Sequence, residues 1–195
     1  MLEALGGLGA AFGLATSAGL NAYIPLLIVA LAARFPLEHP YLHLAEPYNL
    51  IGSWWAIAIL GILLFIEMTV DKIPAVDTIN DVIQTFIRPA AGAILFAANA
   101  NVVTDIHPIL ALIAGLMVAG SVHTAKGVMR PFVTATTGGT GNWFVSLVED
   151  IIAFFVSVLS VIIPILALLV ALALTIWIFR VYRRRKQQKV ATYKT

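Results

Sequence analysis

Long apolar runs take up most of this 195-residue chain and constrain its fold more than any other feature. The longest, 143–179, is apolar for nearly two membrane crossings, and only Glu149, Asp150 and Pro164 interrupt it. The chain is 61% hydrophobic and 11% charged, with a mean hydropathy of +0.96, which indicates a protein that spans the membrane several times. The other apolar segments are 5–33, 56–70, 89–103 and 108–122.

These runs predict an all-α fold, a polytopic transmembrane helical bundle. A chain of this length holds about five to seven spans of ~20 residues, which leaves no room for a separate soluble domain. We therefore expect one transmembrane domain over 1–182, followed by a basic tail over 183–195. The chain has no cysteine, which excludes disulfides, zinc–thiolate sites, iron–sulfur clusters and cysteine nucleophiles.

Basic residues crowd the end of the last apolar run, from Arg180 to Lys189. This pattern is typical of a stop-transfer anchor that faces the cytoplasm, and it predicts the lipid bilayer as partner. Binding of the tail to anionic lipid or to nucleic acid is the alternative; we expect no nucleic-acid partner. With a cytoplasmic tail and six crossings, both termini are predicted in the cytoplasm. The inner side then holds Lys72, Arg88, Lys126 and Arg130.

The first apolar segment, 5–33, is too long for one straight crossing. Its middle, from Gly19 to Pro25, contains small and polar residues and ends in proline. Proline removes a backbone donor and clashes with the preceding turn, so we expect the helix to be kinked or broken there.

A weak internal repeat relates the two halves of the chain. The segment 17–25 resembles 123–131, and the run that ends at Glu67 resembles the run that ends at Glu149. An odd number of segments in each half would invert the second half in the membrane. Two inverted three-segment repeats with broken or re-entrant helices, about 5–103 and 108–180, are typical of transport proteins.

Six charges lie between Glu67 and Arg88, in a chain that otherwise avoids them. A charge at the bilayer centre costs roughly 2.5–3.5 kcal/mol on insertion scales, so this cluster needs a reason. A helix from about Pro74 would place Asp77, Asp81 and Arg88 on one polar face beside an apolar stripe. Two alternatives stay open: the helix lies in the interface plane, or it packs re-entrantly and its polar face lines a cavity.

Clustered carboxylates suit the binding or relay of a cation or proton, and basic groups suit anion or gate contacts. Alternatively, Glu149 and Asp150 only form an interhelical ion pair with Lys126 or Arg130 that fixes packing. The candidate cation, proton or cavity-lining residues are Asn21, Glu67, Asp71, Asp77, Asp81, Glu149 and Asp150. The candidate anion or gate residues are Lys72, Arg88, Lys126 and Arg130.

No metal-binding cassette such as HExxH occurs, and no cofactor is expected. The carboxylates at 67, 71, 77 and 81 offer oxygen ligands for Mg²⁺, but without EF-hand spacing and with Pro74 breaking the helical register. His107 and His123 are expected to be solvated or hydrogen-bonded.

The motif Val70-Asp71-Lys72-Ile73-Pro74, with Asp77 and Arg88-Pro89 beyond it, resembles an uncharacterised family of small bacterial polytopic membrane proteins. The resemblance covers most of residues 8–175, and the family is classed as a domain of unknown function. It implies a location in the bacterial inner (plasma) membrane and no particular reaction.

The leading functional hypothesis is a small transporter or channel-like carrier with a central polar cavity, coupled to a cation or proton, and not an enzyme. Its substrate would be a small ion, a metabolite or a lipid. A second hypothesis is a membrane-embedded enzyme or lipid-handling protein that acts on phosphorylated head groups. A third is a non-catalytic scaffold that forms homo-oligomers.

Overall fold

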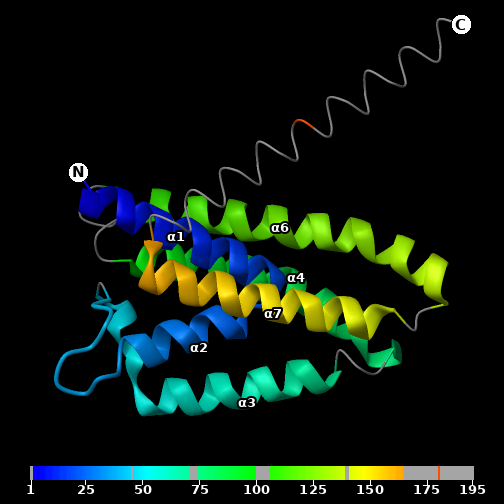
Figure 1. The fold of residues 1–195 in the computed structure, drawn as a ribbon, viewed down its shortest axis with the longest axis horizontal. Helices are drawn as coiled ribbons and strands as arrows, with labels where there is room; N and C mark the ends of the chain where they lie inside the picture. The colour runs from blue at the N-terminus through cyan, green and yellow to red at the C-terminus, as the bar shows by residue number, and fades with distance from the viewer. Residues whose placement is uncertain are drawn as a thin grey trace, which may run out of the picture.

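The computed structural model describes residues 2–44, 46–70, 74–99, 106–138, 141–164 and 180, with side chains at 2–5 and 74–79 left out. Over these residues the chain forms six α-helices and one 3-10 turn, which confirms the all-α prediction (Figure 1). The elements are α1 (Leu2–Leu20), α2 (Tyr23–Ala32), η1 (Tyr48–Gly52), α3 (Trp54–Val70), α4 (Pro74–Ala98), α6 (Pro108–Thr137) and α7 (Asn142–Ile162).

The outer surface of the bundle is apolar. Three helical stretches are long and apolar enough to cross a membrane, namely Asn80–Ala98, Pro108–Thr137 and Asn142–Ile162. Large apolar side chains point outward from them, and Phe86 is 74% exposed. A water-soluble bundle would bury such groups, so the chain is a membrane protein.

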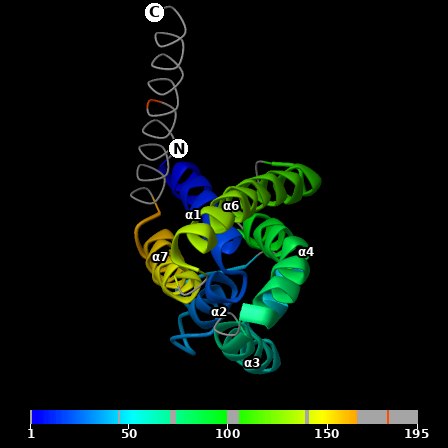
Figure 2. The same ribbon diagram turned by 90° about the vertical axis from the view of Figure 1, so that its right-hand side faces the viewer.

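Helix α1 occupies the centre of the bundle, with α4, α6 and α7 packed around it (Figure 2). Its buried face is built from small residues, among them Ala11, Ala15 and Ala18, which are fully buried. Small side chains allow helix backbones to approach closely, which drives association in lipid, where apolar burial gives little gain. The sequence of α1 therefore suits a central position.

Helix α1 runs antiparallel to α7. At the start of α1, Gly6 lies against Pro164, which follows α7. Further along, the Ser17 hydroxyl donates a hydrogen bond to the Ala153 carbonyl, 2.7 Å away. Increasing residue number in α1 thus corresponds to decreasing number in α7.

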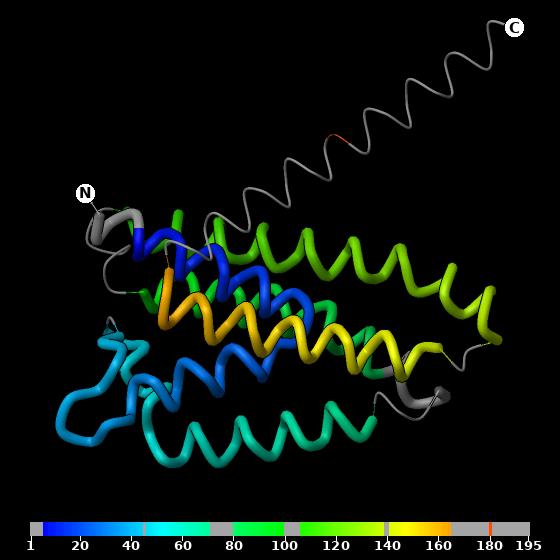
Figure 3. The backbone as a smooth tube through the Cα atoms, viewed as in Figure 1, coloured from blue at the N-terminus to red at the C-terminus, as the bar shows by residue number. Residues whose placement is uncertain are grey.

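Helix α2 turns back and runs in the same direction as α7. Asn21, just before α2, contacts Asp150, whereas Ala32 at its far end shares a cavity with Val161 and Ile162. Helices α1 and α2 therefore form a re-entrant hairpin that enters and leaves the bundle at the same end (Figure 3). We call the turn between them, residues 20–23, the hairpin tip.

The hairpin corrects the predicted topology, which counted 5–33 as a single kinked crossing. Gly6, near the start of α1, and Tyr41, in the loop after α2, line the same cavity of about 280 Å³. One crossing would have placed them at opposite ends of the bundle. The start of α1 therefore lies on the side of the 33–47 loop, and the cytoplasmic placement of both termini stays a prediction.

Local chemistry explains the break at the tip. The Asn21 side-chain oxygen accepts hydrogen bonds from the backbone N–H groups of Tyr23 and Ile24, which have no partner within a starting helix. Pro25 lies in the first turn of α2, where its missing N–H costs nothing. A Cβ on Gly19 would lie only 2.6 Å from the Ala119 carbonyl oxygen of α6, so glycine permits this close approach.

Among the described residues of the second half, the segment predicted to match this break is unbroken. The segment 123–131, predicted as the counterpart of 17–25, lies within the continuous helix α6, with Pro131 inside it. Helix α6 is long enough to carry this proline in its last two turns. The broken-helix prediction is confirmed for the first half only, and the inverted repeat remains a prediction.

Helix α4 begins at Pro74, as the sequence predicted, and continues through Pro89 to Ala98. Its polar face points into the bundle, because Gln84 and Arg88 are buried while Phe86 is exposed. The helix therefore does not lie in the interface plane with its polar side in water, and it is not a short re-entrant segment. The buried Gln84 and Arg88 agree with an inward polar face, whereas the re-entrant packing assumed with it does not occur in this continuous helix, and the cavity-lining role stays a prediction.

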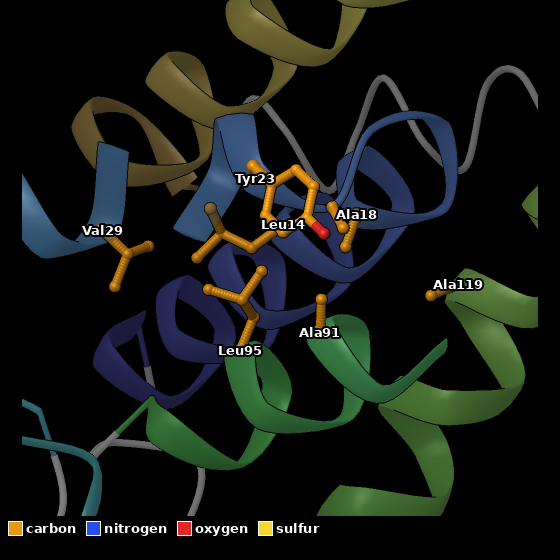
Figure 4. Close-up of a cluster of buried hydrophobic side chains, with 8 residues drawn as sticks. Leu14, Ala18, Tyr23, Val29, Ala91, Leu95 and Ala119 are labelled. Carbon is orange, nitrogen blue, oxygen red and sulfur yellow. The ribbon is translucent and has the colours of Figure 1, made fainter. Parts of the chain in front are cut away.

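Apolar packing holds the hairpin against α4 (Figure 4). Leu14 and Ala18 of α1 and Tyr23 of α2 form one buried cluster with Ala91 and Leu95 of α4. This cluster fixes the hairpin tip next to the polar residues of α3, α4, α6 and α7.

Candidate functional site

Buried polar side chains from five helices gather around the hairpin tip. We divide them into three groups. The arginine cluster is Tyr23, Glu67, Gln84, Arg88 and His123; the tip cluster is Leu20, Asn21, Lys126, Glu149 and Asp150; and the mouth pair is Asp81 and Arg130.

The arginine cluster is built on an ion pair sealed from the surroundings. Arg88 of α4 is 0% exposed and Glu67 of α3 is 2% exposed, and their side chains meet at 3.1 Å. Arg88 lies near the middle of the 25-residue α4. A lone charge there would be very costly, and the opposite charge of each residue offsets the desolvation cost of the other.

His123 of α6 extends this cluster as a neutral ring. Its Nδ1 lies 3.3 Å from a terminal nitrogen of Arg88, and its Nε2 lies 3.1 Å from the Thr85 hydroxyl. A guanidinium can only donate, so Nδ1 must be the acceptor and Nε2 carries the proton. His123 is thus hydrogen-bonded, as predicted, and adds no charge in this arrangement.

Tyr23 and Gln84 complete the arginine cluster. Tyr23, the first residue of α2, lies beside Gln84, Glu67 and Arg88. Gln84 Oε1 and Arg88 Nε are buried and have no hydrogen-bond partner among the described residues. The cluster therefore keeps the capacity to bind a further polar molecule such as water.

The tip cluster joins the end of α1 to α6 and α7. The Lys126 ammonium of α6 lies 2.7 Å from Glu149 Oε2 and 3.4 Å from the Leu20 carbonyl oxygen. Next to it, the Asn21 side-chain amide donates to Asp150 Oδ1 at 2.9 Å. The hairpin tip thus contacts Asp150 directly through Asn21. It contacts Lys126, the partner of Glu149, through the Leu20 carbonyl.

The two half-helices place opposite dipole ends at this tip. Leu20 ends α1, whose last carbonyls carry partial negative charge, and the ammonium of Lys126 lies against them. The N–H groups that begin α2 are occupied by Asn21. The tip therefore brings a negative helix end and the Glu149 carboxylate to the Lys126 ammonium.

The carboxylates of the two clusters are engaged in different ways. In the arginine cluster, Glu67 pairs with Arg88 and His123 is neutral. In the tip cluster, Glu149 pairs with Lys126, and Asp150 accepts a hydrogen bond from Asn21. The tip cluster therefore joins charged groups to a break between two helices.

The mouth pair lies at the end of the bundle where α6 meets α7. Arg130 donates to Asp81 of α4, and both line a cavity of about 490 Å³ together with Thr134 and Asn142. Gly127, next to Lys126, lines the same cavity. Lys126 of the tip cluster is therefore adjacent in sequence to a residue that lines this cavity.

A contact between serines continues the polar line toward the other end of the bundle. The hydroxyls of Ser17 and Ser157 lie 2.6 Å apart, and both residues are fully buried. One turn further along α7, Ser160 lines the cavity of about 280 Å³ beside the start of α1. Polar groups thus connect two cavities at opposite ends of the α1–α7 interface.

The comparison with protein families decides the membership of the chain. Residues 8–184 match the model of the domain of unknown function DUF4126. The chain belongs to the DUF4126 family. No curated protein and no solved structure matches it. The resemblance predicted from the sequence is confirmed, and membership brings no reaction with it.

The DUF4126 chain brings most of the predicted site residues together. Of the candidates, only Asp71, Lys72 and the side chain of Asp77 lie outside the described residues. The predicted residues that do gather are Asn21, Glu67, Asp81, Arg88, Lys126, Arg130, Glu149 and Asp150. The three basic residues among them each contact a carboxylate, and the pairing of Glu149 with Lys126 is the geometry that the packing alternative predicted.

The magnesium hypothesis receives no support from the described residues. Glu67 and Asp81, two of its four proposed ligands, are each engaged by an arginine. Within the part of the chain that the structure describes, no group of three metal-ligating side chains occurs. Asp71 and Asp77 lie outside this test.

Sequence reasoning missed the serines of the DUF4126 bundle. Ser146, Ala153, Ser157 and Ser160 form one buried face of α7 opposite Ser17. Their helical spacing among bulky apolar residues is a usable signal for a close interface. Tyr23 was also missed, because its partners come from helices distant in sequence.

Proposed function

We propose that this protein is a small membrane transporter or channel-like carrier coupled to a proton or a monovalent cation. The observation that carries the proposal is the helix break at the hairpin tip, which meets Lys126, Glu149 and Asp150 inside a membrane-spanning bundle. Ionisable groups are costly to keep charged at such a depth. A carboxylate that takes up a proton or a small cation there and releases it again performs the elementary step of coupled transport.

The re-entrant hairpin supports this proposal. Many transporters bind their coupling ions at helix ends that meet inside the bundle, because these ends offer backbone dipoles and free carbonyl groups. Here the end of α1 and the start of α2 meet at Leu20–Tyr23, among four helices that run past them. Cavities lie at both ends of the α1–α7 interface, so the tip could be reached alternately from either side.

We further propose an orientation in the bacterial inner membrane. Lys72 lies in the α3–α4 connection of the chain, and Arg130 lies near the α6–α7 connection. The positive-inside rule favours the cytoplasm for that end of the bundle. The start of α1 and the loop containing Arg34 would then face the opposite side.

Flux into liposomes tests the proposal. Purified protein is reconstituted with a pH-sensitive dye trapped inside, and a potassium gradient with valinomycin sets the membrane potential. We expect proton flux above that of empty liposomes, stimulated by Na⁺ or K⁺ if a metal cation is coupled. Glu149→Gln should abolish it, because it removes the carboxylate that pairs with Lys126, and thermal unfolding checks that the variant is folded.

Absence of flux in every ion condition, from a protein that is folded and inserted, would contradict the proposal. If the variants changed only thermal stability, a non-catalytic scaffold would explain the network better.

A second candidate function is the handling of a phosphorylated lipid head group. The mouth cavity of about 490 Å³ favours it, because the pair of Arg130 and Asp81 lies there beside the neutral polar groups of Thr134 and Asn142. Phosphate is well matched by arginine. An enzyme of this kind would convert a phospholipid in detergent, where no gradient exists, whereas a transporter would leave it unchanged.

A further inference from the structure

His123 of α6 bridges two residues that lie one turn apart on α4. Its Nδ1 accepts a hydrogen bond from Arg88 at 3.3 Å, and its Nε2–H donates to the Thr85 hydroxyl oxygen at 3.1 Å. The Thr85 hydroxyl donates its own proton to the Asp81 carbonyl oxygen at 2.8 Å, so only its oxygen is left for the ring. Both ring nitrogens are thus engaged, in a way that requires the neutral imidazole.

A second proton on this ring conflicts with the charges around it. Within the described residues, the charged side chains that act on His123 from α4 and α6 are one acid and three bases, namely Asp81, Arg88, Lys126 and Arg130. Each of the three bases already contacts a carboxylate, and two of these carboxylates come from neighbouring helices, namely Glu67 of α3 and Glu149 of α7. A proton on Nδ1 would face the Arg88 guanidinium, which can only donate, so protonation breaks this contact.

Water from the mouth cavity can supply the proton. Asp81, one turn before Thr85 on α4, lines this cavity of about 490 Å³. Gly127, one turn after His123 on α6, lines it as well. His123 is itself partly exposed, whereas Arg88 is fully buried. The ring therefore lies between the open end of the bundle and the sealed arginine.

Two contacts connect the ring to the hairpin tip. Val122, next to His123, packs against Gly19, which precedes the tip; a Cβ added to this glycine would lie 2.6 Å from the Val122 Cβ. Through Nδ1 the ring also contacts Arg88, which lies beside Tyr23, the first residue of α2. A shift of α6 at His123 thus alters the packing of α1 and the polar surroundings of α2 together.

We propose that His123 is a proton-operated latch, which holds α6 against α4 and the hairpin tip while its ring is neutral and releases them when the ring takes up a proton. The Nδ1 lone pair takes a proton from water, and the imidazolium then repels Arg88 and turns toward the mouth cavity. Val122 moves with it and frees the end of α1. The latch goes beyond the proposed function, because it acts on the fold whether or not an ion is transported.

Exposure of the hairpin tip at different pH values tests the latch. The chain has no cysteine, so Leu20→Cys introduces a single thiol at the end of α1. Its rate of reaction with a water-soluble maleimide is measured on the full chain in lipid nanodiscs between about pH 5 and pH 8, the range in which histidine titrates. Thr136→Cys, at an exposed position near the end of α6, corrects for the pH dependence of the thiol itself.

The ratio of the two rates should rise roughly tenfold or more as the pH falls, because a hydrogen bond to a charged group is lost. In a His123→Asn background the ratio should stay low, since the amide oxygen can still accept from Arg88 but takes up no proton. In a His123→Lys background it should be high at every pH, because an ammonium can only donate. His107→Asn is the matched control, because it changes the histidine that caps the other end of α6, and it should keep the response.

A ratio that does not change with pH would overturn the proposal, and so would a response that persists in His123→Asn. If His123→Lys does not fold, thermal unfolding of the other two proteins decides. The wild type should lose stability as the pH falls through the same range, because the folded contact needs the neutral ring, and His123→Asn should lose less. Equal losses would contradict the latch. Neither readout measures flux, so failure of the latch and failure of the transporter proposal are distinguishable.

Discussion

Two ion pairs lie inside the same bundle, yet they are built differently. Arg88 and Glu67 are both almost fully buried and balance each other one to one. Lys126 and Glu149 are less enclosed, and the neighbouring Asp150 accepts a hydrogen bond from Asn21 at the hairpin tip. A sealed ion pair holds helices together, whereas a pair at a helix break changes its contacts when the break moves. We therefore expect the arginine cluster to stabilise the bundle, and we propose the tip cluster for ion coupling.

The largest expected effect comes from breaking the balanced pair. Arg88→Met leaves Glu67 buried without its guanidinium, and removing one partner of a buried pair costs about 3–5 kcal/mol. We expect a loss of that size in the free energy of unfolding, measured by denaturant titration in detergent micelles. His123 loses a hydrogen-bond donor at the same time.

The double variant Glu67→Gln/Arg88→Met removes both charges and is the matched control. It should recover most of the lost stability, because a buried pair replaced by neutral residues is often close to neutral. If the double variant were as unstable as the single one, the cluster would stabilise the bundle by packing and not by charge balance.

The next effect concerns the position of the tip itself. Gly19→Ala places a methyl group 2.6 Å from the Ala119 carbonyl and from Val122, so the tip must shift away from α6. Overpacking of this kind costs about 1–3 kcal/mol. Thermal unfolding should show the loss, and flux should fall with it.

Gly61→Ala is the control for Gly19→Ala, because a Cβ at Gly61 meets nothing within 4 Å. Alanine there should be neutral or stabilise α3 by up to about 1 kcal/mol, since it favours helix more than glycine does. Equal effects at the two glycines would contradict the close approach of tip and α6.

A smaller effect separates the two roles of Asn21. Asn21→Ala removes the cap of α2 and the donor to Asp150, and we expect a loss of about 0.5–2 kcal/mol. Asn21→Asp keeps the capping oxygen but places a third carboxylate at the tip. Its stability should rise with alkali salt relative to N-methyl-D-glucamine chloride, whereas that of Asn21→Ala should not.

The smallest effect is expected at the contact between serines. Ser17→Ala removes hydrogen bonds to Ala153 and Ser157, and such bonds in membrane bundles contribute about 0.6 kcal/mol on average. The unfolding midpoint should fall only slightly. A loss of stability as large as that of Arg88→Met would contradict this ranking. It would mean that the contact between serines stabilises the hairpin as much as the Arg88–Glu67 pair stabilises the bundle.

The sequence predicted much of this arrangement, for identifiable reasons. Apolar run lengths indicated the helices, and an interior position for the polar face of α4, where Arg88 lies, was one of two alternatives left open. The pairing of Glu149 with Lys126 was one of the alternatives left open. Charges in apolar surroundings restrict the possible structures strongly, so residues of this kind are readable from sequence.

The hairpin was not predictable in the same way. A helix that breaks at Asn21 has the same composition whether it continues across the membrane or turns back. The direction of α2 depends on contacts with Val158, Val161 and Ile162, which are distant in the chain. Similarly, Pro131 looked like the counterpart of Pro25, but α6 continues through it. Tertiary contacts decided both cases.

Flux through two variants that each alter one cluster tests the assignment of roles most directly. Asp150→Asn removes one of the two carboxylates of the tip cluster and leaves the Asn21 contact able to form. Glu67→Gln/Arg88→Met removes the balanced pair and leaves the tip unchanged. In liposomes we expect the first variant to lose ion-driven flux and the second to retain it. Retained flux in Asp150→Asn, with flux lost in the folded double variant, would contradict the central claim.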